Sequence, residues 1–198
     1  NKGIFLQNGE IQFKGSIDET ISAYLDGADG QNPAFKVYTN DAVFSEHDGN
    51  VFLKEVSLID ANNQPLTNFH VTEKAGIKIK FEVINNQEIN PIPNIHLSHS
   101  LGGKVLVSVC DAQPYAFGET NTYEATVWFP PNFFNNGYFN VGVAISTLNP
   151  VQVHVADYES ISFEVIDSLD APTRNGYTGK IDGYLRPQLD WDTKKIEK

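Results

Sequence analysis

The sequence is poor in cysteine and in basic residues, and it contains no long apolar run. Cys110 is the only cysteine, so an intrachain disulfide is excluded. No segment approaches the roughly 18–20 apolar residues that a membrane-spanning helix needs. Lysine and arginine number 14 against 25 acidic residues, giving a net charge of −11. This charge disfavours nucleic acid and anionic lipid as partners.

Two further absences bear on location and on fold. The beginning of the chain lacks the basic-then-apolar order of a secretion signal. Together with the single cysteine, this favours the cytoplasm. A chain of 198 residues is long enough to bury a sizeable core, and we expect one core.

The first 25 residues predict a hairpin followed by a short helix. Asn8-Gly9 lies between two apolar runs, and this dipeptide suits a type I′ turn. Ser16 and Glu19 have the spacing of a capping box at a helix start. The predicted helix carries one apolar stripe, formed by Ile17, Ile21, Tyr24 and Leu25. Such a small unit buries too little surface to be stable alone, so its apolar faces need a partner.

This pattern, KGIFLQNGEIQFKGS followed by IDETISAYL, resembles the last hairpin and helix of an ABC-transporter ATPase domain. The phosphate-binding loop of such a domain is missing, because Gly102-Gly103-Lys104 lacks the first glycine of that motif. The resemblance implies that ATP and Mg²⁺ bind in a missing upstream domain, and that this fragment binds no cofactor.

The next residues mark a boundary between domains. The run DGADGQNPA is rich in aspartate, glycine and asparagine, and this composition is typical of a connector. We therefore divide the chain into an ATPase tail (1–25), a linker (26–36), a main domain (37–167) and a closing segment (168–198).

The main domain alternates between apolar and polar residues with a period of two. Such runs, separated by short turns, predict an all-β antiparallel sandwich. The segments are 51–60, 76–84, 94–101, 104–109, 122–129, 138–146, 151–156 and 160–166. A jelly roll has the same strand signals. The order of VWFPP, a loop and GYFNVGV resembles the E-to-F corner of immunoglobulin-like folds, and this favours an immunoglobulin-like topology.

Taken together, the tail, the linker, the sandwich and the closing segment GYLRPQLDW resemble the C-terminal region of Wzt-type ATPases, which serve the export of O-antigen and related polysaccharides. The resemblance implies a non-catalytic carbohydrate-binding module. Its cargo would be the polysaccharide on a polyprenyl-diphosphate carrier, recognised at the non-reducing end. It also implies a homodimer that can exchange residues 178–191, and a membrane-spanning permease as partner at the inner membrane, on its cytoplasmic side.

Alternation identifies a candidate sugar-binding face. Ile95, Leu97 and Leu101 are expected to face the core, as are Phe139, Val141, Val143, Ile145, Val151, Val153 and Val155. An immunoglobulin-like sheet would then bring the remaining side chains to one outer surface. The candidate sugar contacts are His96, Ser98, Tyr138, Asn140, Gln152 and His154. An ordinary polar outer face would have the same pattern.

Several other residues are secondary candidates for sugar contact. They are Ser100, Tyr115, Phe117 and Trp128. Strand 122–129 belongs to the opposite sheet in this topology, so Trp128 is expected to be covered rather than bound to sugar. Gly142 predicts close approach by a ligand or by another backbone, or a bulge. Trp191 is expected to anchor the terminal strand or to make a dimer contact, rather than to bind the ligand.

The sequence offers no clear catalytic motif. It contains no G-x-S-x-G elbow. His96 and His99 lie at an odd separation on one strand, so they cannot chelate one metal ion. Glycoside hydrolysis needs two facing carboxylates, and no pair stands out among Asp111, Glu119, Glu124, Asp157 and Glu159. Two alternatives remain: a dimerisation or docking domain that does not bind glycan, and a glycan-modifying enzyme.

Overall fold

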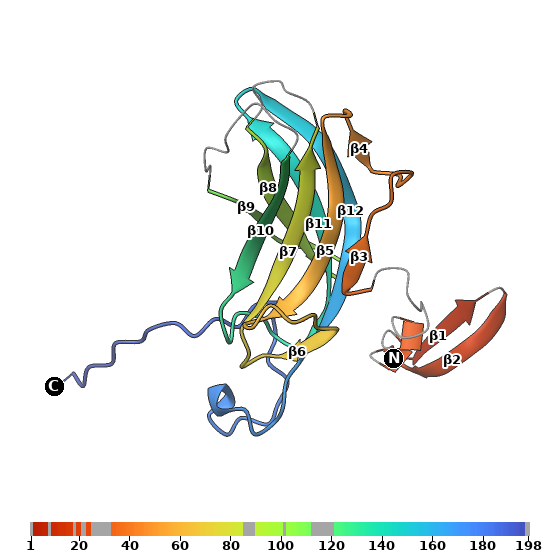
Figure 1. Cartoon of the computed structure of the whole chain (residues 1–198). Coiled ribbons are helices and arrows are strands. Elements are labelled where there is room, and N and C mark those ends of the chain that lie inside the picture. Colours follow the sequence, from red (N-terminus) through yellow and green to blue (C-terminus); the bar gives the residue numbers. More distant parts are fainter. Residues whose placement is uncertain are drawn as a thin grey trace. The chain divides into compact units, whose positions relative to one another are not determined.

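The computed structural model describes residues 2–7, 9–17, 19–20, 23–24, 33–84, 90–100, 102–111 and 121–196. The chain divides into two compact units, residues 1–31 and residues 32–198. The first unit is small and the second contains the sandwich. Each unit is described by itself below (Figure 1).

The first unit is a hairpin with a helical segment. Strands β1 (Lys2–Gln7) and β2 (Glu10–Ser16) pair in antiparallel fashion. Gly9, in the turn between them, has a φ of +83°, a conformation that glycine adopts readily. The capping box is confirmed, because the backbone N–H of Ser16 donates to Glu19 Oε2 at 2.8 Å and the N–H of Glu19 donates to Ser16 Oγ at 3.3 Å.

The hairpin and the helical segment pack on each other through few residues. Phe5 is buried, and its ring contacts Tyr24 edge-on at 5.3 Å. Several other apolar side chains remain exposed in this unit, namely Ile4, Leu6, Ile11 and Ile17. Ile21 and Leu25, which complete the predicted apolar stripe, lie outside the described residues. The unit therefore presents apolar surface that its own residues do not cover.

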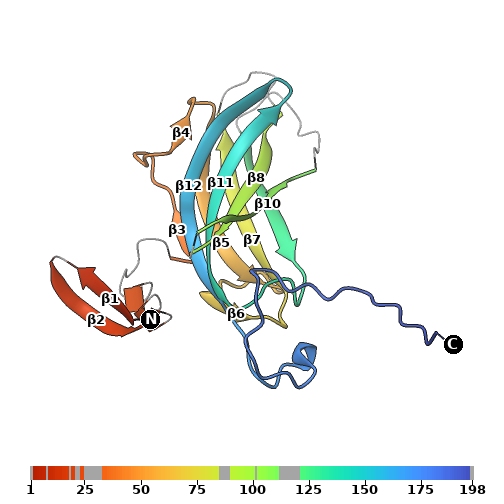
Figure 2. The same cartoon turned by 180° about the vertical axis from the view of Figure 1, so that it is seen from behind.

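The second unit is a sandwich of two sheets, as predicted (Figures 1 and 2). One sheet has the order β10-β7-β5-β3, formed by Asn121–Phe129, Ala75–Val83, Val51–Asp60 and Phe35–Val37. The other has the order β4-β12-β11-β8-β9, formed by Glu46–His47, Val151–Ile166, Gly137–Leu148, Ile92–His99 and Lys104–Val109. A short strand, β6 (Asn68–His70), pairs in parallel with β12.

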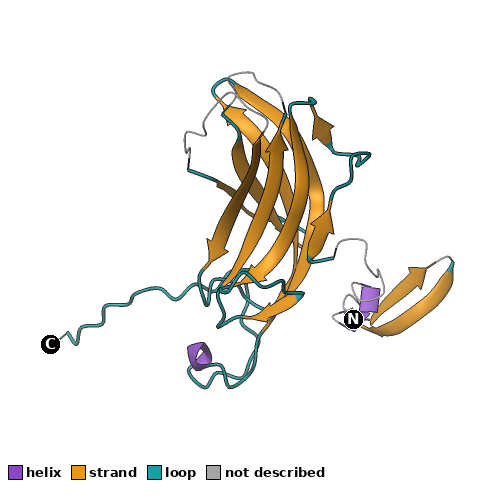
Figure 3. Cartoon of the chain, viewed as in Figure 1, coloured by secondary structure: helices purple, strands orange, loops and turns teal. Residues whose placement is uncertain are grey.

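Strands dominate the sandwich (Figure 3). The one helical element described in residues 33–84, 90–100, 102–111 and 121–196 is the 3₁₀ turn η1 (Pro172–Arg174). Within the described part of the chain, no helix is long and apolar enough to cross a membrane.

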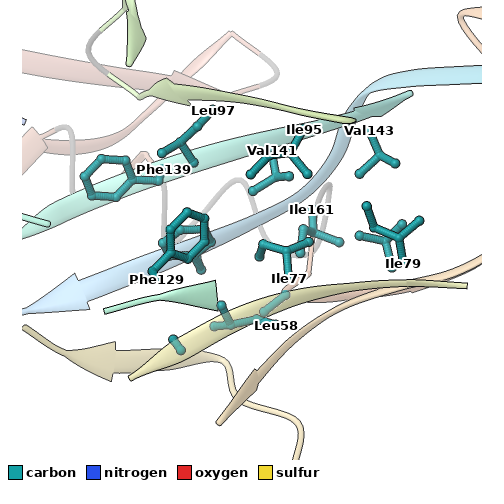
Figure 4. Packing of buried hydrophobic residues seen from close by; sticks show 14 of the residues in the cluster. Leu58, Ile77, Ile79, Ile95, Leu97, Phe129, Phe139, Val141, Val143 and Ile161 are labelled. Atoms are coloured by element: carbon teal, nitrogen blue, oxygen red, sulfur yellow. The ribbon is translucent and has the colours of Figure 1, made fainter. Parts of the chain in front are cut away.

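The core lies between the two sheets (Figure 4). Leu58, Ile77 and Ile79 face it from the four-stranded sheet. Leu97 on β8 and Phe139 on β11 face it from the other sheet. Along each of these two strands, residues that face the core alternate with residues that face outward. This alternation is the reason that the sequence pattern identified these strands correctly.

The strand order is immunoglobulin-like in both sheets. Strands β12, β11, β8 and β9 lie in the order that the G, F, C and C′ strands have in immunoglobulin variable domains. The three strands predicted to share one sheet, 94–101, 138–146 and 151–155, are confirmed as neighbours. In the other sheet β7, the strand before β8, pairs directly with β10, the strand before β11, as strands B and E do in an immunoglobulin domain.

The closing segment returns to the sandwich of its own chain. Leu185 forms a β-bridge with Phe134, and the N–H of Arg186 donates to the carbonyl of Phe133 at 3.0 Å. Tyr184 stacks on His99, with ring centroids 4.4 Å apart. Residues 187–196 are exposed throughout. Trp191, predicted as an anchor, is 86% exposed and anchors nothing within this unit.

Candidate functional site

Four of the predicted sugar contacts lie together on the outer face of the larger sheet. Asn140 on β11 pairs with Ser98 on β8. His96 lies two positions before Ser98 on β8, and Tyr138 lies two positions before Asn140 on β11. Residues two apart on a strand point to the same face, so all four share it. All four side chains are partly exposed. We call His96, Ser98, Tyr138 and Asn140 the outer-face patch.

Hydrogen bonds fix the ring of His96 within this patch. Its Nε2 donates to Asn94 Oδ1 at 3.1 Å, while Nδ1 accepts from the ammonium of Lys104 at 3.5 Å. Burial lowers the pKa of His96, and the charge of Lys104 lowers it further. His96 is therefore neutral near pH 7, with one nitrogen as donor and the other as acceptor.

Tyr158 contributes an aromatic ring to the same face, a position that strand alternation in the sequence did not predict. Its ring contacts His96 edge-on at 5.4 Å and is 41% exposed. The hydroxyl donates to Glu46 Oε1 at 2.8 Å, and this hydrogen bond is the main cause that raises the pKa of Tyr158. Residues 151–156 and 160–166, predicted as separate strands, form one strand, and Tyr158 lies at a bulge within it. In the sequence, the polar run DYES interrupts the apolar alternation at the position of this bulge.

Gly142 lies directly beneath this bulge. A Cβ at position 142 would lie 2.8 Å from the Cα of Tyr158 and 2.9 Å from its carbonyl oxygen. The close approach predicted at Gly142 is therefore made by another backbone rather than by a ligand.

Gly142→Ala is expected to destabilise the protein by about 1–3 kcal/mol, because the new methyl group must displace backbone atoms of the bulge. Urea denaturation gives the difference in unfolding free energy. Ser98→Ala, on the paired strand and the same face, is the control and should change stability by less than about 0.5 kcal/mol. A Gly142→Ala variant as stable as the parent would show that the bulge moves freely.

The other two predicted contacts lie elsewhere. His154 is only 1% exposed, so its predicted outward, accessible position is wrong. Its Nε2 is 2.7 Å from Thr147 Oγ1, and its Nδ1 is 2.7 Å from Asp48 Oδ2. Gln152 is exposed and donates to the same carboxylate oxygen at 3.1 Å. With both ring nitrogens bonded inside the protein, His154 holds this end of the hairpin to Asp48.

The register explains the error at His154. The pairing of β11 and β12 shifts between Ile145 and Ser146, and such a shift changes the side to which later residues point. Val151, predicted in the core, is 78% exposed, whereas Val155 is buried as predicted. Thr147, the partner of Gln152, lies five positions along β11 from Gly142, the partner of His96. Gln152 is therefore about 16 Å from the patch along the strand.

The secondary candidates have different positions. Ser100 lies just past β8, and its N–H donates to the carbonyl of Tyr138 at 3.0 Å. Trp128 lies on β10 in the opposite sheet, as predicted. Its ring packs over Gly76 and carries the ammonium of Lys74 at 4.4 Å from its centroid. Tyr115 and Phe117 lie outside the described residues.

Among the predicted carboxylates, Asp157 is held by contacts inside the protein. Asp157 is buried and bonds the ammonium of Lys36 at 2.6 Å and the hydroxyl of Tyr38 at 2.8 Å. Burial raises the pKa of Tyr38 strongly. Glu119 lies outside the described residues. In the parts of the chain that the structure describes, no three His, Cys, Asp or Glu side chains are placed to hold a metal ion.

Comparisons with known proteins relate this chain to one fold. No family model and no curated protein matches the sequence. Among solved structures, the crystal structure of the C-terminal domain of Wzt matches with a TM-score of 0.61 and 12% identity, over 82% of this chain and 92% of that chain. The chain thus shares its all-β, antiparallel sandwich with the C-terminal domain of Wzt.

Proposed function

We propose that the sandwich is a non-catalytic carbohydrate-binding domain that selects polysaccharide for an ABC exporter. The observation that carries this proposal is the outer-face patch with the exposed ring of Tyr158 beside it. The shared fold with the C-terminal domain of Wzt supports the same assignment.

The chemistry of the patch suits a sugar ring. Sugars present apolar C–H patches surrounded by hydroxyl groups, so they bind where an aromatic ring lies among donors and acceptors. Tyr158 provides the ring, Ser98 a hydroxyl and Asn140 an amide. His96 is neutral and its two ring nitrogens are bonded to Asn94 and Lys104, so it contributes an uncharged ring surface beside Tyr158. Such a shallow site favours weak binding, which a repeating polysaccharide strengthens through multivalency.

The contacts of Asp157 favour a binding role over catalysis at this carboxylate. Asp157 is occupied by Lys36 and Tyr38. Hydrolysis needs two carboxylates that are free to face each other across a cleft, so Asp157 is a poor candidate for one of them.

The proposed cargo is the polysaccharide on its polyprenyl-diphosphate carrier, recognised at the non-reducing end. In this proposal residues 1–25 end an ATPase domain that binds ATP and Mg²⁺ and drives a membrane-spanning permease from the cytoplasmic side of the inner membrane. The uncovered apolar side chains Ile4, Leu6 and Ile11 support a larger partner for the hairpin. The exporter would be a homodimer.

The experiment is a titration of residues 32–198 with O-polysaccharide released from the cells that produce this protein, followed by NMR. We expect saturable shifts with a dissociation constant of about 0.1–1 mM. Tyr158→Ala and Asn140→Ala should each weaken binding about tenfold, because each removes a contact worth about 1.4 kcal/mol.

Gln152→Ala is the matched control, because Gln152 is exposed on the same sheet but distant from the patch. It should bind as the parent does. If Tyr158→Ala and Asn140→Ala both bind normally, the outer-face patch with Tyr158 beside it is not the site.

A dimerisation or docking domain is the second candidate function. The exposed apolar side chains of Leu189, Trp191 and Ile196 in the terminal segment favour it. Residues 181–186 dock on their own chain, which leaves residues 187–191 of the proposed exchange segment free to reach a second copy. The same titration separates the two functions, since a pure docking domain does not bind polysaccharide.

A further inference from the structure

A cleft opens between the edges of the two sheets. Strands β9 and β10 are edge strands, and each belongs to a different sheet. The cleft between them has a volume of about 420 Å³. Residues of β8 and β9 line one side, residues of β10 line the other, and Ile79 of β7 also contributes. We call this the sheet-edge cleft; it is separate from the residues of the outer-face patch.

Polar side chains without protein partners line the cleft. Ser108, Asp111 and Thr126 all contribute to its surface. Among the described residues, none of these three side chains has a hydrogen-bond or ion-pair partner. Their oxygen atoms are thus available to hydroxyl groups of a ligand.

The rest of the lining restricts the ligand class. Pro93, Ile95 and Val127 provide apolar contacts. The lining residues include no lysine, arginine or histidine, and the ammonium of Lys74 lies on the ring of the lining residue Trp128, where it is already engaged, so the lining itself offers no cation to a phosphate or a uronate. Asp111 is the one charged residue among them, and it would repel an anion. The volume lies near the small end of the roughly 300–1,000 Å³ range of ligand pockets.

Asn94 connects the cleft to the outer-face patch. It lines the cleft, and its Oδ1 accepts the hydrogen bond from Nε2 of His96 in the patch. Asn94 is buried and also donates to Ser146 at 3.3 Å, so its side chain is held in place. A glycan crossing the patch could therefore continue around the edge of the sheet.

We propose that the sheet-edge cleft binds one neutral hexose unit of the same glycan that crosses the outer-face patch. This inference rests on the proposed function and adds to it a second subsite with a stated charge preference. Hydroxyl groups of the hexose would bond Ser108, Thr126 and Asp111, and its C–H groups would pack on the apolar wall.

Cys110 provides a local probe of this subsite. It lines the cleft, it is partly exposed, and it is the only cysteine in the chain. The rate of its reaction with an aromatic disulfide reagent reports occupancy of the cleft. The probes are the methyl glycosides of mannose, glucose and galactose at about 100 mM, a concentration that reveals even a very weak site. We expect at least one of them to slow the reaction severalfold, and glucuronate and glucose 6-phosphate to have no effect.

Thr126→Val is the test variant, because it removes a hydroxyl while keeping the shape of the side chain. It should raise the half-protecting concentration about tenfold. Thr122→Val, on the same face of β10 but outside the cleft, is the matched control and should leave protection unchanged. Tyr158→Ala should also leave protection by a methyl glycoside unchanged.

The outcomes distinguish this inference from the proposed function. Polysaccharide binding that depends on Tyr158 but leaves Cys110 reactivity unchanged would overturn the subsite alone. Protection of Cys110 that is equal for acidic and neutral sugars would also overturn the proposed subsite. So would protection of Cys110 that is unaltered in Thr126→Val. Absence of both polysaccharide binding and Cys110 protection would overturn both proposals.

Discussion

Phe134→Ala is expected to lower the free energy of unfolding by about 3–5 kcal/mol, the usual cost of truncating a fully buried phenylalanine. Phe134 is 1% exposed. Its ring lies among five others at centroid distances of 4.8–5.8 Å, those of Phe69, Phe129, Phe133, Phe139 and Phe163. The cavity left by alanine cannot close easily, because strands on both sides hold these rings in place.

Urea denaturation monitored by circular dichroism measures this loss. Phe35→Ala is the matched control, since Phe35 is 42% exposed on an edge strand and should cost far less. If Phe134→Ala does not fold, Phe134→Leu provides the measurement, because it leaves a smaller cavity. A loss below 1 kcal/mol for both Phe134 variants would show that this aromatic cluster does not support the core.

Phe134 is also a core residue that strand alternation in the sequence does not predict. It lies in a segment that the sequence pattern placed in a loop, so alternation could not assign it to the core. Its ring packs among phenylalanines of several strands, and its backbone forms a bridge to Leu185, which lies 51 positions later in the chain. The strand pattern predicts faces within a strand, whereas such pairings between distant segments leave no periodic signal.

The candidate site was predictable from the sequence only where the strands alternate without a register shift. The faces of His96, Ser98, Tyr138 and Asn140 follow from strict alternation, and the structure confirms them. His154 and Tyr158 were misjudged because each lies beside a register shift in β12. A bulge adds residues to one strand only, so the partner strand must be known before the faces can be assigned. The sheet-edge cleft combines two edge strands of different sheets, and their proximity is likewise non-local.

Asp167→Ala is expected to cost about 3–5 kcal/mol, because it leaves buried arginine charge without its partner. Asp167 follows β12, and its side chain is 3% exposed. Its Oδ2 accepts from Arg174 Nη2 at 2.8 Å and from Arg186 Nη1 at 2.7 Å. Arg186 belongs to the closing segment, so the carboxylate joins that segment to the end of the sandwich.

The pH dependence of this cluster has a definite sign. Burial alone would raise the pKa of Asp167, but the hydrogen bonds and charges of Arg186 and Arg174 outweigh it and hold the pKa below its ordinary value. A carboxyl whose pKa is lower in the folded state stabilises the fold above its ordinary pKa of about 3.9. This stabilisation is lost as the pH falls through the lowered folded-state value.

The measurement compares the parent with Asp167→Ala by denaturation from pH 7 downward. The difference in unfolding free energy between parent and variant should stay constant down to about pH 4 and become smaller below it. Protonation of Asp167 removes the ionised carboxylate from the parent, and the variant lacks this carboxylate at every pH. Asp190→Ala, in the exposed terminal segment, should match the parent at every pH. Limited proteolysis should cut residues 178–191 faster in Asp167→Ala, because Arg186 loses its anchor. Equal cleavage rates would mean that the bridge between Leu185 and Phe134 holds the segment without the carboxylate.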